Sequence, residues 1–294
     1  MTPAVLWPTL LGLSFLAAGI LTYRRDVRAA AARDAFGLVV LGPTFVAAAL
    51  AAFAGEHFTI AANIASIVPK WLPARLFIAY FVGVAHLAAA SSFVARRYIR
   101  WAAISLAVMF ALFVLLMDLP AAIAHPAVLL NWTLAARQAT FAMGALALFA
   151  TETRGRWPDT SRTIAAIARI WTAGVLVLYG VQHIMHPEFT PGVPSPVLTA
   201  AWVPLPQLLA YATGVLLVVF GIAMFIERFA SAGAALCGLL MTLLTLALYV
   251  PDFFLAGSVQ QRIMAINFVF DTLLFAGTVL VISKAIAAAD SSRP

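Results

Sequence analysis

Nine long apolar runs dominate this sequence and constrain its fold more than any other feature. They cover residues 4–22, 35–57, 74–95, 99–118, 131–151, 163–183, 207–227, 231–250 and 262–283. A helix needs about 20 mainly apolar residues to cross a bilayer. Charged residues make up only 10% of the chain, whereas a soluble domain carries roughly 25%. The sequence therefore predicts an all-α polytopic membrane protein with nine transmembrane helices.

The positions of lysine and arginine predict the orientation of these helices. No basic residue precedes the first run, and Arg24, Arg25 and Arg28 follow it. This pattern favours a retained helix with its N-terminus outside over a signal peptide. The outer ends then hold only four of the 18 Lys and Arg residues, namely Lys70, Arg75, Arg137 and Arg262. We expect a multi-pass protein of the cell membrane with a cytoplasmic C-terminus.

The same placement explains the formal net charge of +7. A cytoplasmic excess of positive charge is a topology signal, with at most a weak attraction for anionic lipid head groups. We therefore expect membrane lipids as partners and no nucleic acid.

Two halves of the chain carry the same pattern. Residues 53–57, Phe-Ala-Gly-Glu-His, recur at residues 179–183 as Tyr-Gly-Val-Gln-His: aromatic, small, small, acid or amide, histidine. The spacing from Gly83 to Pro120 also equals that from Gly214 to Pro251. Equal spacing indicates an internal duplication, and four helices in each copy give both copies the same orientation. We predict a parallel repeat with the arrangement 1 + 4 + 4.

The predicted organisation has five parts. They are an extra N-terminal helix with a basic loop (1–34), a first four-helix repeat (35–151), a cytoplasmic linker (152–162), a second repeat (163–284) and a cytoplasmic tail (285–294). Gly42-Pro43 is expected to kink the second helix. One small-residue face in each half is expected to look into the bundle: Ala79, Gly83, His86 and Ala90, and then Ala210, Gly214, Leu217 and Gly221.

Polar residues within the runs gather toward the outer ends. An ionisable group at mid-helix costs about 2.5–3.5 kcal/mol and usually faces the protein interior, so we predict an outward-facing polar pocket. Its candidate pocket and proton-handling residues are Glu56, His57, His86, Arg137, Gln182, His183 and Asp271. Candidates for outer charge pairs are Asp118, Asp252 and Arg262. We expect Arg137 to neutralise Glu56 or Asp118.

Several of these residues have two interpretations. His57 and His183 are either helix-end residues or functional groups. His86 is either a buried histidine bonded to a neighbouring hydroxyl or part of a site. Asp271 is either a structural acid bonded to the first half or a proton-carrying or cation-pairing group.

Metal and haem chemistry are weakly indicated. His57 and His183 could supply two axial haem ligands if they met at the pseudo-twofold axis, but nothing in the sequence turns both toward it. The run His186-Pro187-Glu188 lacks metal-ligand spacing. The one cysteine, Cys237, cannot form a dithiol pair and is expected to be a buried core residue. Nucleotide-binding and hydrolase motifs are absent from the sequence.

Several segments of the first half resemble the DoxX-like superfamily of four-helix membrane proteins. They are residues 55–58 (Gly-Glu-His-Phe), 68–73 (Val-Pro-Lys-Trp-Leu-Pro), 80–86 (Tyr-Phe-Val-Gly-Val-Ala-His) and the span from Met109 to Pro120. The second half is similar more loosely, through Tyr179-Gly180, His183, Pro187, residues 202–206 and Tyr211. Its outer loop is longer and its counterpart of His86 is Leu217. The resemblance implies two tandem DoxX-like units after one extra helix.

The resemblance also implies a link to redox chemistry. Members include membrane subunits of thiosulfate:quinone oxidoreductases and partners of periplasmic thiol or radical-detoxifying enzymes. The leading hypothesis is a quinone-linked membrane component with a membrane or periplasmic redox protein as partner. The alternatives are a non-enzymatic membrane scaffold and a small-solute transporter that uses Asp271 and His86.

Overall fold

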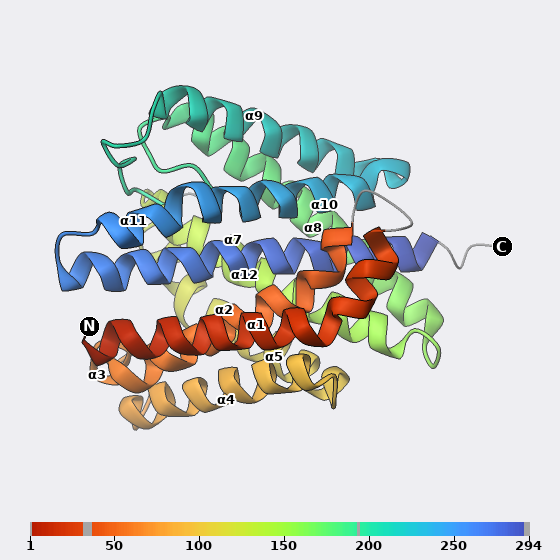
Figure 1. Cartoon of the computed structure of the whole chain (residues 1–294), viewed down its shortest axis with the longest axis horizontal. Coiled ribbons are helices and arrows are strands. Elements are labelled where there is room, and N and C mark those ends of the chain that lie inside the picture. The colour runs from red at the N-terminus through yellow and green to blue at the C-terminus, as the bar shows by residue number, and fades with distance from the viewer. Residues whose placement is uncertain (1, 32–36, 193–194, 291–294) are drawn as a thin grey trace.

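The structure, a computed structural model, describes residues 2–31, 37–192 and 195–290. Within these ranges, nine helices are long and apolar enough to cross a membrane, as the nine runs predict (Figure 1). The single-helix spans are α1 (Pro3–Ala31), α4 (Arg75–Ala95), α7 (Leu129–Thr153), α8 (Pro158–Met185), α9 (Pro206–Phe225) and α12 (Val259–Asp290). The chain is thus a multi-pass membrane protein of the all-α class.

Three spans are composite. A 3-10 turn, η1 (Gly37–Leu41), leads into α2 (Gly42–Thr59). Helix α5 (Ile99–Phe113) continues through a π turn, η2 (Val114–Asp118), into α6 (Leu119–Ala124). In the same way α10 (Glu227–Leu244) continues through η3 (Thr245–Tyr249) into α11 (Val250–Leu255). A short helix, α3 (Ala61–Ile67), follows α2.

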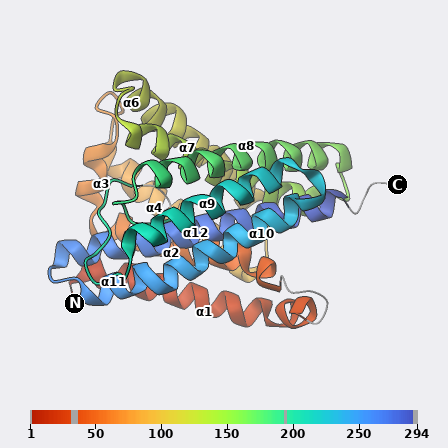
Figure 2. The ribbon, with the colours of Figure 1, turned by 90° about the horizontal axis from the view of Figure 1, so that it is seen from above.

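Helix α12 forms the centre of the bundle. In its most apolar stretch 83% of the residues are buried, against 22% in α1 and in the α5–α6 span. It packs against α2, α7, α8 and α10, and Figure 2 shows it running beneath the outer helices. Two of its side chains, the ionisable Asp271 and the amide Asn267, are of the kind that avoids lipid and favours a place inside the bundle. The last span of the chain therefore lies between spans of the first half.

Small residues bring these helices close together. A Cβ atom added at Gly277 of α12 would lie 2.8 Å from the carbonyl oxygen of Gly42. One added at Gly180 of α8 would lie 2.5 Å from the carbonyl oxygen of Gly214 in α9. The two predicted small-residue faces are buried along their whole length. Close backbone approach of this kind is how helices associate in lipid.

Both halves share three local features at matching places. A π turn and a short helix with proline in its first turn occur in each, as η2–α6 with Pro120 and η3–α11 with Pro251. A residue with positive φ precedes α4 (Ala74, 51°) and α9 (Leu205, 47°). The third feature is a glycine packed on the Cβ atom of a helix-end histidine, Gly83 on His57 and Gly214 on His183.

Two predictions about helix boundaries need correction. Pro43 does not kink α2, because it lies in the first turn of that helix, where its missing N–H is harmless. The linker predicted at 152–162 is shorter, since α7 extends to Thr153 and α8 begins at Pro158. Arg33 and Arg293, and with them the ends of the parts predicted at 1–34 and 285–294, lie outside the described residues.

Candidate functional site

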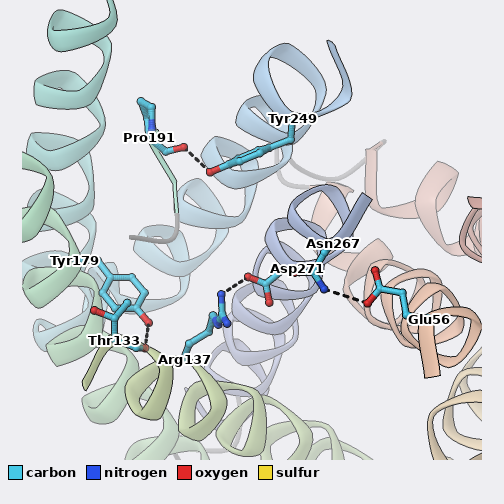
Figure 3. Close-up of polar contacts among 8 residues, drawn as sticks. All are labelled: Glu56, Thr133, Arg137, Tyr179, Pro191, Tyr249, Asn267 and Asp271. Carbon is cyan, nitrogen blue, oxygen red and sulfur yellow. Dashed lines mark hydrogen bonds and ion pairs between the residues drawn. The ribbon is translucent and has the colours of Figure 1, made fainter. Parts of the chain in front are cut away.

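A buried ion pair joins α7 to α12. Nη1 of Arg137 donates a hydrogen bond to Oδ2 of Asp271 at 2.6 Å, and these side chains are 17% and 9% exposed (Figure 3). The ion pair of Arg137 is thus with Asp271 and not with Glu56 or Asp118, although the charge of Arg137 also acts on Asp118. Because α12 packs against both α7 and α2, the Asp271 carboxylate lies beside the guanidinium. Asp271 bonds a residue of the first half, and because this residue is a cation, the pair agrees with both interpretations of Asp271.

Glu56 extends this contact into a row of polar side chains across three helices. Oε2 of Glu56 on α2 accepts a hydrogen bond from Nδ2 of Asn267 on α12 at 3.1 Å. Asn267 lies one helical turn before Asp271, so Glu56, Asn267, Asp271 and Arg137 follow one another from α2 to α7 (Figure 3). We call these four residues the polar row. Glu56 is 7% exposed, and its Oε1 atom has no hydrogen-bond partner among residues 2–31, 37–192 and 195–290.

Asp118 adds a third carboxyl group beside this row. It is the last residue of η2, and Arg137 is the cation that acts on it electrostatically. In the described part of the chain, its Oδ2 atom is buried without a hydrogen-bond partner, as is Nε of Arg137. Asp118 is thus a further acid near Arg137, whose ion pair is with Asp271.

Hydrogen bonds to Thr133 connect the start of α7 to α8. The hydroxyl of Tyr179 donates to the carbonyl oxygen of Thr133 at 3.1 Å, and the Thr133 hydroxyl donates to Oε1 of Gln182 at 3.3 Å. Nε2 of Gln182 is buried and has no hydrogen-bond partner in the part of the chain that the structure describes. Gln182 thus lies beside the polar row without a bond to it.

The two recurrent histidines make separate contacts. Nδ1 of His57 lies 2.7 Å from the carbonyl oxygen of Ala79 on α4. Nδ1 of His183 lies 2.9 Å from the carbonyl oxygen of Tyr179, and its Nε2 accepts a hydrogen bond from the backbone N–H of Gly192 at 2.9 Å. Both ring nitrogens of His183 are therefore engaged, so it is a neutral imidazole without a lone pair for iron.

His86 lies next to His57, away from the polar row. It is 4% exposed, its ring meets that of His57 edge-on at 5.4 Å between centroids, and Phe53 and Phe110 flank it. Neither ring nitrogen has a partner in the described residues. The hydroxyl partner expected for His86 is therefore not found there, because aromatic rings occupy its surroundings.

Two of the three candidates for outer charge pairs, Asp252 and Arg262, bond to groups outside that set. Oδ1 of Asp252 accepts a hydrogen bond from Nε1 of Trp202 at 2.7 Å, and Nε of Arg262 donates to the carbonyl oxygen of Ala256 at 3.3 Å. Ala256 ends α11, and a basic side chain at a helix C-terminus satisfies such free carbonyls. Among the described residues Asp118, Asp252 and Arg262 thus form no ion pair with one another. Cys237 is buried, as expected.

A pocket of about 490 Å³ opens at the end of the bundle that carries α6 and α11. We call this end the α6/α11 end. The pocket lies between α11, the start of α12 and the connection from α8 to α9, and its walls include Trp202, Tyr249, Asp252, Gln261, Met264 and Phe268. Of these, the sequence singled out only Asp252 as a candidate residue. Tyr249 and Phe268 sit within apolar runs, where nothing distinguishes a pocket wall from a core residue.

The described part of the α8–α9 connection is fixed at three points. Phe189 and Leu198 form an isolated antiparallel bridge. The hydroxyl of Tyr249 donates to the carbonyl oxygen of Pro191 at 2.9 Å, and His183 accepts from Gly192. Gly192 has φ of +138°, and a Cβ atom there would lie 2.7 Å from the Tyr249 hydroxyl oxygen. These contacts hold one wall of the pocket against the bundle.

Replacing His183 with phenylalanine should loosen this wall. The variant keeps the ring but leaves the buried N–H of Gly192 without its acceptor, a loss of about 1–3 kcal/mol. Hydrogen–deuterium exchange of the segment 189–192 should become faster. His186→Phe is the matched control, because the partly exposed His186 side chain has the Glu188 carboxylate as its hydrogen-bond partner among the described residues, and phenylalanine keeps a ring to stack on Phe189. Equal exchange in the two variants would contradict the role of His183.

Within the described ranges, no group of three or more His, Cys, Asp or Glu side chains could hold a metal ion. No protein-family model, curated protein or solved structure matches the chain. The membrane class therefore rests on the helices themselves.

Proposed function

We propose that this protein is a redox-associated membrane component that binds a quinone-type head group in the pocket at the α6/α11 end. The pocket carries the proposal: its volume of about 490 Å³ falls within the range of roughly 300–1,000 Å³ typical of small-molecule sites. Its walls combine aromatic rings (Trp202, Tyr249 and Phe268) with a few polar groups (Asp252 and Gln261). A planar ring bearing two carbonyl oxygens fits such a lining.

The bonded pair of Trp202 and Asp252 supplies the chemistry. Quinone reduction adds protons to the carbonyl oxygens, so a group that gives or takes a proton must lie beside the ring. The Asp252 carboxyl group is such a group, and Trp202 Nε1–H donates to it at 2.7 Å. His57 and His183 were the histidines expected to handle protons. His57 instead contacts α4, and His183 accepts a hydrogen bond from the backbone of Gly192. We therefore assign the proton-handling role to Asp252. The electrons would come from a separate membrane or periplasmic redox protein.

We further propose that the pocket faces outward. The connections α4–α5, α7–α8 and α9–α10 lie at the opposite end of the bundle (Figure 1). Arg96, Arg97, Arg154 and Arg156 lie in these connections, and Arg100, Arg162 and Arg228 lie in the helical turns that follow them. Because basic residues concentrate on the cytoplasmic side, this charge supports an outer N-terminus and a cytoplasmic C-terminus.

The duplication belongs to the same proposal. We take α2–α7 and α8–α12 to be two tandem DoxX-like units preceded by α1. Support comes from the matching π turns, the positive φ values of Ala74 and Leu205, and the matching packing of Gly83 and Gly214 on histidines. Such units would carry the quinone-linked chemistry that the resemblance to the DoxX-like superfamily implies.

Quinone binding can be measured directly on the purified protein. Lipid extracts of detergent-purified protein should contain quinone, and a short-chain quinone should bind the quinone-depleted protein. Trp202→Ala and Asp252→Asn should each weaken binding at least tenfold, or by about 1.4 kcal/mol. Trp132→Ala is the matched control, because Trp132 is also partly exposed near this end but bonds Pro126.

Undiminished quinone binding in both pocket variants would contradict this site. Protein that retains no quinone, binds none and co-purifies with a second membrane protein would favour the scaffold alternative.

A further inference from the structure

We propose that Glu56 is a proton-binding site within the membrane and holds an exchangeable proton on Oε1. This inference concerns the polar row and does not depend on quinone binding. It rests on the charge balance around Arg137, on the unpartnered Oε1 atom of Glu56 and on access to water through Asn267.

The charges of the cluster do not balance if every acid is ionised. The buried acids Glu56 and Asp271 would carry two negative charges against the single positive charge of Arg137, and the partly buried Asp118 would add a third negative charge. Buried charges need a partner, because desolvation of an unpaired ion costs several kcal/mol. The guanidinium is bonded to Asp271 at 2.6 Å. The cluster therefore requires additional positive charge, and a proton is the smallest carrier of it.

Glu56 is the acid best placed to carry that proton. Asp271 accepts a charged hydrogen bond, which favours its ionised form. Glu56 instead receives a neutral amide hydrogen bond from Asn267, and the negative charge of Asp271 acts on it. Its other oxygen, Oε1, is buried without a partner. A protonated carboxyl group with Oε2 as acceptor and Oε1 as hydroxyl satisfies the bond to Asn267 without an unpaired charge.

The groups facing the polar row from the neighbouring elements do not supply this charge. Helix α8 and η3 contribute the hydroxyls of Tyr179 and Tyr249, which bond to backbone carbonyl oxygens. Helix α4 contributes His86, which lies against His57, and η2 contributes Asp118, a further acid. Helix α1 meets this part of α2 through Trp7 and Pro8 at Gly55.

Glu56 is buried, but its partner is not. Asn267 is exposed, and Met264, one helical turn earlier on α12, lines the pocket at the α6/α11 end. The pocket wall therefore ends within one helical turn of the hydrogen-bond partner of Glu56, and we infer that water enters from this end. The proton on Glu56 should exchange with protons of the water on that side of the membrane.

Infrared difference spectroscopy of the full-length protein in liposomes tests the proposal. A protonated carboxyl group has a carbonyl band distinct from that of a carboxylate. We expect such a band at neutral pH, a shift of this band in heavy water, and its loss in alkaline buffer and in Glu56→Gln. Asp118→Asn, which removes the acid at the end of η2, should retain the band.

Isotope-labelled glutamate makes the test independent of any variant, because a band of Glu56 must shift in labelled wild-type protein. A neutral-pH band that does not shift with the label would overturn the proposal, as would its persistence in Glu56→Gln. A thermal stability that rises with sodium in the wild type but not in Glu56→Gln would also overturn it, since a metal cation would then supply the charge.

Discussion

Replacing Arg137 with methionine should destabilise the folded protein by about 3–5 kcal/mol, because it leaves the buried Asp271 carboxylate without its partner. The Asp271 side chain is only 9% exposed, so water cannot replace the lost bond. Thermal unfolding of the detergent-purified protein measures the effect. The loss should be largest in alkaline buffer, since in acid Asp271 can take up a proton and lose its charge.

Arg96→Met is the matched control for this prediction. Arg96 also bonds an aspartate, Asp26, at 2.8 Å, but these side chains are 48% and 43% exposed. Exposed ion pairs contribute about 0–1 kcal/mol. The double variant Arg137→Met with Asp271→Leu should recover much of the stability, because it removes both buried charges. Equal losses of stability in Arg137→Met and Arg96→Met would contradict the burial of the Arg137–Asp271 ion pair inside the bundle.

Replacing Gly180 with leucine should separate α8 from α9. A Cβ atom at Gly180 would lie 2.5 Å from the backbone carbonyl oxygen of Gly214, and a backbone atom cannot rotate aside. Overpacking of this kind costs typically about 1–3 kcal/mol and occasionally more. We expect a loss at the upper end of this range in thermal unfolding, with reduced yield of monodisperse protein.

Gly174→Leu is the control within the same helix. Gly174 is exposed, and nothing lies within 4 Å of a Cβ atom added there. Leucine is a better helix former than glycine by several tenths of a kcal/mol, so this variant should be as stable as the wild type or slightly more stable. A similar loss at both positions would mean that the effect arises within α8 and not from its contact with α9.

The sequence predicted those features of the fold that depend on local pattern. Apolar runs of about 20 residues identify membrane spans because the bilayer sets their length. Small residues such as Gly83 and Gly214 identify packed faces because only they allow close backbone approach. Neither signal depends on where a helix lies in the bundle.

The partners of the polar residues depend on which helices lie side by side in the bundle. The local sequence pattern does not show this arrangement. Arg137 binds Asp271, and Glu56 binds Asn267, because α12 lies against both α7 and α2. These partners are more than a hundred residues apart in sequence. The pocket was missed for a related reason. Tyr249 becomes a wall only because the α8–α9 connection folds back onto it.

The π turns η2 and η3 have a consequence for the segments that follow them. A π turn adds one residue to a helix, so all later side chains are rotated by roughly 100° relative to an uninterrupted α-helix. Asp252 follows η3 by three positions, and it points at Trp202 with this extra residue in place. The direction in which α11 presents Asp252, and with it the hydrogen bond to Trp202, therefore depends on a single residue inserted in η3.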